Sequence, residues 1–322
     1  MKILVTGGAG FIASNLTRRL LASGHTVVAV DNFFLGKRKH LEPFLGNANY
    51  TFIEQDLLDL PALHKVFSEH KPQRIWHLAA NSDISFGTKY TDFDLKGGTL
   101  VTYNILEAMR LGGCKELVFS SSGAVYGEPI LHPTPEDYGP MLPISLYAAS
   151  KLACEGLISA YAHSFDIQAW MFRFGNIIGP NPTHGVIPDF LERLMEDRRE
   201  LKILGDGTQA KPYVHVEDCL DGMEYAQAHS NEILNYFNLA VPDRTTVEQI
   251  ANWCMEALEI PVDSCEKRYT GGSRGWRGDV PFVNLDTAKM KNLGWGPSLH
   301  SNEAVKRAIA EIANQLRVSR SE

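Results

Sequence analysis

A tyrosine and a lysine stand four residues apart in the stretch SLYAASK (145–151). If a helix begins at Leu146 and runs to about Ser164, the side chains of Tyr147 and Lys151 lie on one face, one turn apart. A phenol ordinarily has a pKa of about 10, and a neighbouring ammonium group favours the phenolate. The pair could therefore exchange a proton with a substrate, although a solvent-facing Tyr and Lys on an amphipathic helix would give the same pattern.

A glycine-rich turn, GGAGFIA (7–13), follows the apolar run Lys2 to Thr6 and precedes a helical pattern that ends near Gly24. In a strand, turn and helix of this kind, the glycines allow close backbone approach and the helix N-terminus attracts a diphosphate. An ordinary turn is the alternative. Ala13 stands where a third glycine is common. The expected cofactor contacts are Gly7, Gly10, Phe11 and Ile12.

An acidic residue, Asp31, ends the second predicted strand (Thr26 to Val30), about 20 residues after Gly10. A carboxylate at this place accepts hydrogen bonds from the adenosine ribose and repels a 2′-phosphate, so NAD is favoured over NADP. Asn32 belongs to the same predicted site. The basic run 37–39 keeps NADP open as an alternative.

Two further strands bring small or polar residues to the same edge of the predicted sheet. Tyr50 to Ile53 leads to residues that could bond and pack against an adenine, and Arg74 to Leu78 leads to alanines that allow close approach. His77 is either a base or a packed histidine. The expected contacts are Asp56, Leu57, Ala79 and Ala80.

A fifth predicted strand, Glu116 to Ser120, delivers three serines (120–122) at its carboxyl end. Open parallel sheets bind their ligands at this edge. Taken singly, each serine is better explained as a loop hydrogen bonder than as a catalyst, so Ser122 is a catalytic candidate only together with the Tyr-Lys pair.

The alternation of strands and helices predicts an α/β fold, a doubly wound parallel (Rossmann) sheet with a smaller C-terminal substrate-binding domain. The composition changes after Phe174 toward loop-forming Gly and Pro residues. We therefore expect an NAD-binding domain over residues 1–175, with a return segment near 212–240, and a substrate domain over 176–322. A long helix is expected over about 94–111, and residues 317–322 look disordered.

The overall composition excludes several classes of protein. The 322 residues carry a net charge of −7, which argues against a nucleic-acid-binding protein. No apolar run is long enough to span a bilayer, and no signal peptide is recognisable at the start. The five cysteines are widely spaced, so we expect reduced thiols, no metal site and a cytoplasmic protein.

Taken together, the glycine-rich turn, Asp31, Ser122 and the Tyr147-Lys151 pair resemble the extended short-chain dehydrogenase/reductases. Within that group the chain resembles the NAD-dependent epimerases/dehydratases of nucleotide sugars. The similarity covers nearly the whole chain and includes VYG (125–127) and GDGTQ (205–209).

The residues that follow Ser122 bear on the subfamily. Dehydratases of this family carry an Asp-Glu pair there, whereas this chain has Gly123 and Ala124, which cannot transfer a proton. The closest resemblance is therefore to UDP-galactose 4-epimerases of the shorter, archaeal type. It implies that Tyr147 is the acid/base, that Ser122 shares the substrate oxygen, and that Lys151 holds the nicotinamide ribose and lowers the pKa of the tyrosine.

The resemblance also implies a nucleotide-sugar substrate and a homodimer formed through the helices after Asp94 and Tyr147. Lys211 stands where most relatives have Arg, Gly98 takes the place of a common Asn, and Ser82 that of a cofactor-binding Lys in some epimerases. The rival activities are an NAD(P)-dependent nucleotide-sugar dehydrogenase or reductase, and an epimerase of a GDP-, CDP- or dTDP-sugar. The alternative that is not an enzyme is a non-catalytic dinucleotide-sensing or interaction protein. The implied substrate-binding residues are Ser122, Asn176, Lys211, Arg274 and Arg277.

Overall fold

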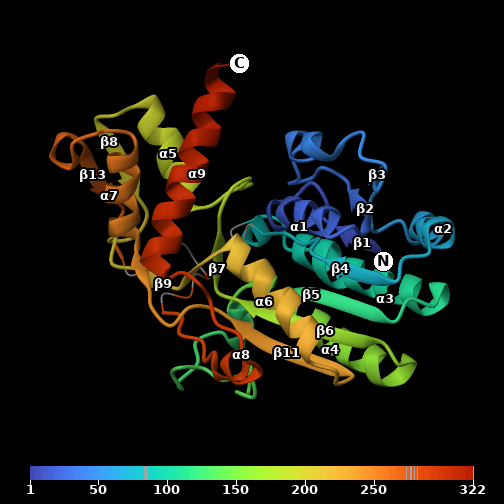
Figure 1. Ribbon diagram of the computed structural model, residues 1–322. Coiled ribbons are helices and arrows are strands. Elements are labelled where there is room, and N and C mark those ends of the chain that lie inside the picture. Colours follow the sequence, from blue (N-terminus) through green and yellow to red (C-terminus); the bar gives the residue numbers. More distant parts are fainter. Residues whose placement is uncertain are drawn as a thin grey trace.

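Seven parallel strands form the central sheet of the computed structural model, which describes residues 1–82, 84, 86–272, 274–275, 278, 280 and 282–321 (Figure 1). Their order across the sheet is β11-β6-β5-β4-β1-β2-β3, so the chain winds outward in both directions from β1. The predicted doubly wound parallel sheet is confirmed. The strands are β1 (Lys2–Thr6), β2 (Thr26–Asp31), β3 (Tyr50–Glu54), β4 (Arg74–His77), β5 (Glu116–Ser122), β6 (Gln168–Phe174) and β11 (Leu234–Leu239).

Helices cover both faces of this sheet. In β1, Ile3 and Val5 pack into one core with α1 (Phe11–Ala22) and α6 (Val216–His229), whereas Leu4 packs into the other. That second core includes α2 (Leu60–His70), α3 (Val101–Gly112) and α4 (Leu146–Phe165). Successive residues of a strand point to opposite faces, so a fully apolar strand is what a sheet covered on both faces requires.

The helix with the Tyr-Lys pair begins where its sequence predicts. The side chain of Ser145, the residue before α4, accepts a hydrogen bond from the backbone N–H of Ala148 at 3.2 Å and so caps the first turn. The helix ends at Phe165, one residue beyond the predicted end. This cap fixes the turn on which Tyr147 and Lys151 lie.

The predicted helix over 94–111 is not one regular helix. A π-helical segment, η4 (Leu95–Leu100), precedes α3 and contains Gly97 and Gly98. A π-helical turn holds one more residue than an α-helical turn, and such turns are common at functional sites.

A second group of elements lies beside the sheet, at the upper left of Figure 1. Three helices and one strand of a parallel pair share a separate apolar core there. The elements are α5 (Val186–Glu196), α7 (Val247–Ala257), α9 (Ser301–Ser321), β8 (Glu200–Ile203) and β13 (Glu266–Tyr269). The backbone of α9 runs to Ser321, so the predicted disorder is wrong for residues 317–321, and Glu322 lies outside the described residues.

Short strand pairs connect this group to the sheet. They are β7 (Asn176–Ile178) with β10 (Tyr213–His215), and β9 (Ala210–Lys211) with β12 (Thr245–Thr246). Further along, β11 returns to the large sheet beside β6. All five cysteines are buried and form no disulfide. Among the described residues, no helix combines the length and the apolar character needed to cross a membrane.

Candidate active site

A cavity of about 360 Å³ lies at the carboxyl ends of the central strands. This is the edge at which open parallel sheets bind ligands, and the volume is in the range of small-molecule sites. Every residue predicted to bind the cofactor lines it: Gly7, Gly10, Phe11, Ile12, Asp31, Asn32, Asp56, Leu57, Ala79, Ala80, Tyr147 and Lys151.

The glycine-rich turn is packed too tightly for side chains. Gly7 has a φ of +69°, and a Cβ atom there would lie 2.9 Å from the Cα atom of Ala79. Gly10 precedes α1 without a side-chain cap, and the first turn of that helix holds no acidic residue. The helix N-terminus therefore presents backbone N–H groups and a positive dipole end, which fit a diphosphate.

The carboxylate of Asp31 is held in place by the backbone. Its Oδ2 atom accepts a hydrogen bond from Ala9 N at 3.0 Å, and Oδ1 accepts one from Phe33 N at 2.7 Å. A Cβ at position 36 would lie 2.8 Å from the same carboxylate, so Gly36 leaves the space that the Asp31 side chain needs. Burial raises the pKa of Asp31 above its ordinary value, whereas these backbone donors lower it.

Two residues of the basic run face other groups. Lys37 Nζ donates to Pro182 O at 3.3 Å, and Arg38 pairs with Glu54 at 2.9 Å. None of the three basic residues, Lys37, Arg38 and Lys39, lines the cavity. The cavity wall therefore presents the Asp31 carboxylate, as a site for NAD requires, and the residues present fit a dinucleotide without a 2′-phosphate.

Tyr147 and Lys151 line this cavity, and Ser122 lies beside Tyr147 without being one of the lining residues. The Ser122 side chain lies within hydrogen-bonding reach of the Tyr147 phenol, whose pKa it lowers. Ser122 Oγ also accepts from Ala124 N at 3.2 Å, so its own proton can be donated to the tyrosine oxygen. Lys151 Nζ donates to Ser120 O at 2.6 Å and lies 6.0 Å from the centre of the Tyr147 ring.

The pKa of the tyrosine differs from the prediction. Burial raises the pKa of Tyr147 to about 12, and the nearby Asp94 carboxylate also raises it, while the Ser122 hydrogen bond lowers it. Burial likewise lowers the pKa of Lys151 to about 8. The four-residue spacing suggests that Lys151 lowers the pKa of Tyr147 by stabilising the phenolate. In the chain alone, the effect of burial, which raises this pKa, is larger.

His77 is a packed histidine rather than a base. Burial lowers its pKa to about 3. Thr6 Oγ1 accepts from the backbone N–H groups of Leu78 and Ala79, so its proton is donated to His77 Nδ1 at 2.7 Å. The other ring nitrogen then donates to Thr102 Oγ1 at 3.0 Å. The neutral His77 ring therefore forms hydrogen bonds through both nitrogens and connects β1, β4 and α3.

Position 123 is closely packed, so a larger side chain would require its neighbours to shift. A Cβ on Gly123 would lie 2.9 Å from Leu285 Cδ1 and 3.2 Å from Phe174 O. A carboxylate could not extend toward the substrate from this position without displacing its neighbours. The structure therefore agrees with the sequence that the acidic pair of the dehydratases has no counterpart at 123 and 124.

Four of the predicted substrate-binding residues are not among those that line the cofactor cavity: Ser122, Asn176, Lys211 and Arg274. Asn176 N donates to Pro212 O at 3.0 Å, which places Asn176 beside Lys211. Arg274 instead forms an ion pair with Glu128 at 2.5 Å. Arg277 lies outside the described residues.

The cavity also has walls that no local motif indicates. Thr183 and His184 line it from a loop held against α1, where Asn15 Nδ2 donates to Pro180 O at 3.0 Å. Their position depends on contacts across most of the chain, which explains why sequence reasoning missed them. The other walls that were missed include Phe34, Leu35, Asn81, Phe93 and Lys96.

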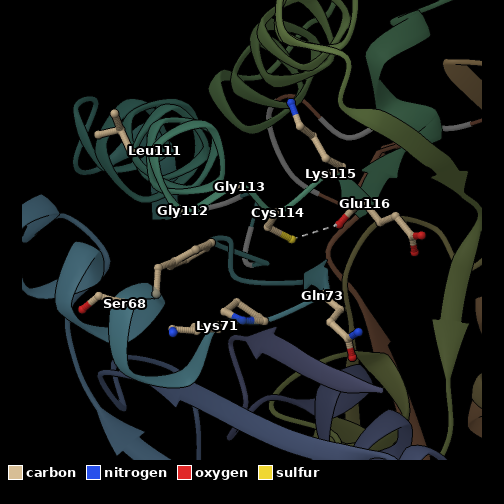
Figure 2. A pocket seen from close by; sticks show the side chains of 11 residues that line it. Ser68, Lys71, Gln73, Leu111, Gly112, Gly113, Cys114, Lys115 and Glu116 are labelled. Carbon is tan, nitrogen blue, oxygen red and sulfur yellow. Dashed lines mark hydrogen bonds between the residues drawn. The ribbon is translucent and has the colours of Figure 1, made fainter.

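Another depression lies at the opposite edge of the sheet (Figure 2). It is formed where α2 and α3 end and β4 and β5 begin, and the Cys114 thiol points into it toward Glu116 O. Burial raises the pKa of this thiol to about 11, so it is not reactive. None of the predicted site residues is among those that line it.

The comparisons with known proteins agree with this geometry. The model of the NAD dependent epimerase/dehydratase family matches residues 3–240. A UDP-glucose 4-epimerase of Mycolicibacterium smegmatis is 32% identical over 98% of this chain and 99% of its own. The structure of a Thermotoga maritima UDP-glucose 4-epimerase with UDP-glucose has 32% identity and a TM-score of 0.88, with 98% and 100% of the two chains covered. A Thermus thermophilus UDP-glucose 4-epimerase in complex with NAD has 30% identity, a TM-score of 0.85, and coverage of 97% and 99%. By sequence and by structure, the chain belongs to the NAD-dependent epimerase/dehydratase family.

Proposed function

We propose that this NAD-dependent nucleotide-sugar epimerase inverts C4 of a UDP-hexose, either UDP-glucose/UDP-galactose or an N-acetyl or uronic analogue. The observation that carries the proposal is the position of Tyr147 in the wall of the cofactor cavity, next to Ser122, with no acidic side chain at 123 or 124. One acid/base group and one hydride acceptor are sufficient for epimerisation at C4. The relatives that act on UDP-glucose support the uridine nucleotide.

The proton chemistry falls to Tyr147 and Ser122. When bound, NAD would accept the hydride from C4 and return it, and would bring a positive charge into the site. Tyr147, as phenolate, takes the proton of the 4-hydroxyl and later returns it to the 4-keto oxygen. Ser122 holds that oxygen through the proton that it can donate.

Lys151 contributes its charge and its fixed position. With a pKa of about 8, the ammonium remains mostly protonated at neutral pH. Its bond to Ser120 O holds it below the Tyr147 ring, where a cation favours the phenolate over the phenol. The high pKa of Tyr147 in the chain alone therefore implies that proton removal is most favourable once the cofactor's positive charge is also present.

We also propose that residues 1–175, with the return segment 212–240, hold NAD, and that residues 176–322 hold the nucleotide-sugar. The return of β11 to the large sheet supports this division. Asn176 and Lys211 lie together where the two groups of elements meet. Lys211 offers a point charge rather than the bidentate fork of Arg, so phosphate binding there depends less on geometry.

The function is tested by NMR with purified protein and no added cofactor. Six substrates are incubated separately: UDP-glucose, UDP-N-acetylglucosamine, UDP-glucuronate and the 4-epimer of each. Interconversion of one pair supports the proposal and selects the sugar. If no pair interconverts even with NAD added, or if cofactor is consumed in proportion to product, the proposal is wrong and the dehydrogenase or reductase is favoured.

A homodimer is proposed through the outer face of α4. This helix is apolar around most of its circumference, yet small residues on one side are exposed. They recur at the spacing of a packed helix seam, and a second helix could approach them closely. Exposed apolar residues of the neighbouring α3 region, Leu95, Leu100 and Tyr103, extend the surface. The small residues are Ala149, Ala153, Gly156 and Ala160.

Replacing Ala153 by Glu should dissociate this dimer, because two carboxylates would be buried across the two-fold axis. Sedimentation velocity should give a dimer for the unmodified chain and a monomer for Ala153→Glu. Ser68→Glu, an exposed change on α2, should leave the dimer intact. An unmodified chain that sediments as a monomer at micromolar concentration would contradict the proposal.

A further inference from the structure

A buried carboxylate outside the predicted site lies beside the turn that carries Tyr147 and Lys151. Asp94 is 2% exposed and directly precedes η4. Its Oδ1 atom accepts a hydrogen bond from Asn81 Nδ2 at 3.0 Å, and its backbone carbonyl accepts one from Ser150 Oγ at 2.7 Å. Asp94 thus joins the loop after β4 to the middle of the catalytic turn in α4.

Two glycines make this junction possible. A Cβ at position 87 would lie 2.2 Å from Asp94 Oδ2, and a Cβ at position 98 would lie 2.2 Å from Ser150 Oγ. Neither distance is compatible with van der Waals contact, so any other residue at Gly87 or Gly98 would displace its neighbour. Thr99 Oγ1 also lies 3.0 Å from Ser150 Oγ, which ties the π-helical segment to α4 a second time.

The junction reaches both the cofactor cavity and the acid/base pair. Asn81 is 4% exposed and lines the cavity beside Ala80. Ser150 directly precedes Lys151 and lies in the turn that follows Tyr147. A shift of Asp94 would therefore move a wall of the cofactor cavity and the catalytic turn together.

We propose that Asp94 is a positioning residue for the epimerisation: its carboxylate holds Asn81 against the cofactor cavity, and its carbonyl holds the Tyr147–Lys151 turn through Ser150. The role rests on the proposed function for its chemistry, but the contacts do not depend on the identity of the sugar. Asp94 is not among the residues that line the cofactor cavity, so it acts through these neighbours.

The charge of Asp94 affects the pKa values of Tyr147 and Lys151, which the loss of a purely structural contact would not change. This charge raises the pKa of Tyr147 and also raises that of Lys151. In Asp94→Asn the amide lacks the charge, so both pKa values should fall, and both limbs of the pH profile of kcat should move to lower pH. Among the described residues, the other titratable or charged groups that act on this pair are Cys154 and Glu155 on α4, with His77 on β4 facing Lys151.

The test compares NAD-loaded unmodified protein with Asp94→Asn. Ultraviolet difference absorbance, each protein against its own Tyr147→Phe version, isolates the ionisation of Tyr147. We expect its pKa to be lower in Asp94→Asn and kcat to fall about tenfold, with both pH limbs displaced downward. An unchanged Tyr147 pKa with unshifted limbs would overturn the proposal.

Matched variants separate positioning from stability. Asp218 is also a buried aspartate that accepts three hydrogen bonds, from the Ser298 hydroxyl and the backbone of Ser298 and Leu299. Asp218→Asn should lower the melting temperature without moving either pH limb. An equal limb shift in Asp218→Asn would contradict a specific role for Asp94.

The two contacts can also be removed without changing the carboxylate. Ser150→Ala should lower kcat with the pH limbs in place, and Asn81→Ala should weaken NAD retention. If both variants behave like the unmodified protein, the positioning role is wrong, even if Asp94→Asn does not fold. The absorbance titration needs no sugar, so inactivity of the unmodified protein toward every UDP-sugar would refute the proposed function and leave the result on Asp94 standing.

Discussion

Replacing Tyr147 by Phe should lower kcat for epimerisation by about 10² to 10⁴-fold, the range expected when a general acid/base is removed. The change deletes one hydroxyl oxygen, the partner of Ser122, and keeps the ring in the cavity wall. NAD binding, measured by cofactor retained after gel filtration, should change little, since the proposed role of the phenol is in proton transfer.

A tyrosine on the same helix provides the control. Tyr161 donates its hydroxyl to Glu107 at 2.5 Å, away from the cavity. Tyr161→Phe also removes a hydroxyl from α4, but it should leave kcat within about twofold of the unmodified value. If Tyr147→Phe retained full activity, another group would have to carry the proton, and the assignment of Tyr147 would be wrong.

Replacing Gly7 by Ala should weaken NAD binding by at least about tenfold, equivalent to about 1.4 kcal/mol. The added methyl group would lie 2.9 Å from Ala79 Cα and 3.0 Å from Ala79 N. Both atoms belong to the backbone, which Thr6 Oγ1 holds by two hydrogen bonds, so no side-chain rotation relieves the contact. The turn would have to move away from β4, and the diphosphate cradle would move with it.

Gly24→Ala is the control for the cost of the backbone conformation, because an added methyl group there makes no clash. Gly24 has a φ of +77°, close to the +69° of Gly7, but an added Cβ would meet no atom within 4 Å. Both alanine variants should lose about 1 to 2 kcal/mol of stability from the left-handed conformation. Calorimetric titration with NAD should show weak binding only for Gly7→Ala, and equal affinities in the two variants would contradict the proposed cradle.

The sequence predicted the large sheet well because its signals are local. Each strand of the first 174 residues is an apolar run that ends at a turn or a polar residue, and the strand Gln168 to Phe174 has its observed bounds. The second group of elements was harder to predict. The strand Glu200–Ile203 has only two apolar residues, and its partner far along the chain, Glu266–Tyr269, has three charged ones. Two-residue strands such as Thr245–Thr246 exist only through their pairing.

For the site, the sequence predicted residue types and missed what tertiary packing decides. Motifs placed Gly7, Asp31 and Tyr147, because each lies at a recognisable point of a strand, turn or helix. The four-residue spacing of Tyr147 and Lys151 could not show that Lys151 is buried and that the phenol of Tyr147 is desolvated, so the predicted fall in the tyrosine pKa was wrong for the chain alone. Asp94 was missed as well, since its contacts with Asn81 and Ser150 depend on the folded arrangement of three segments.

The most direct test of the central proposal is NMR of the reaction with a UDP-sugar that carries deuterium at C4, using the pair that proves active. Oxidation and reduction at C4 by the same enzyme-bound NAD should leave the deuterium on C4 in both epimers, with no net NADH and no exchange with water. Loss of the label to solvent, or its appearance at another carbon, would show that inversion proceeds by proton abstraction or at another centre and would contradict the proposal.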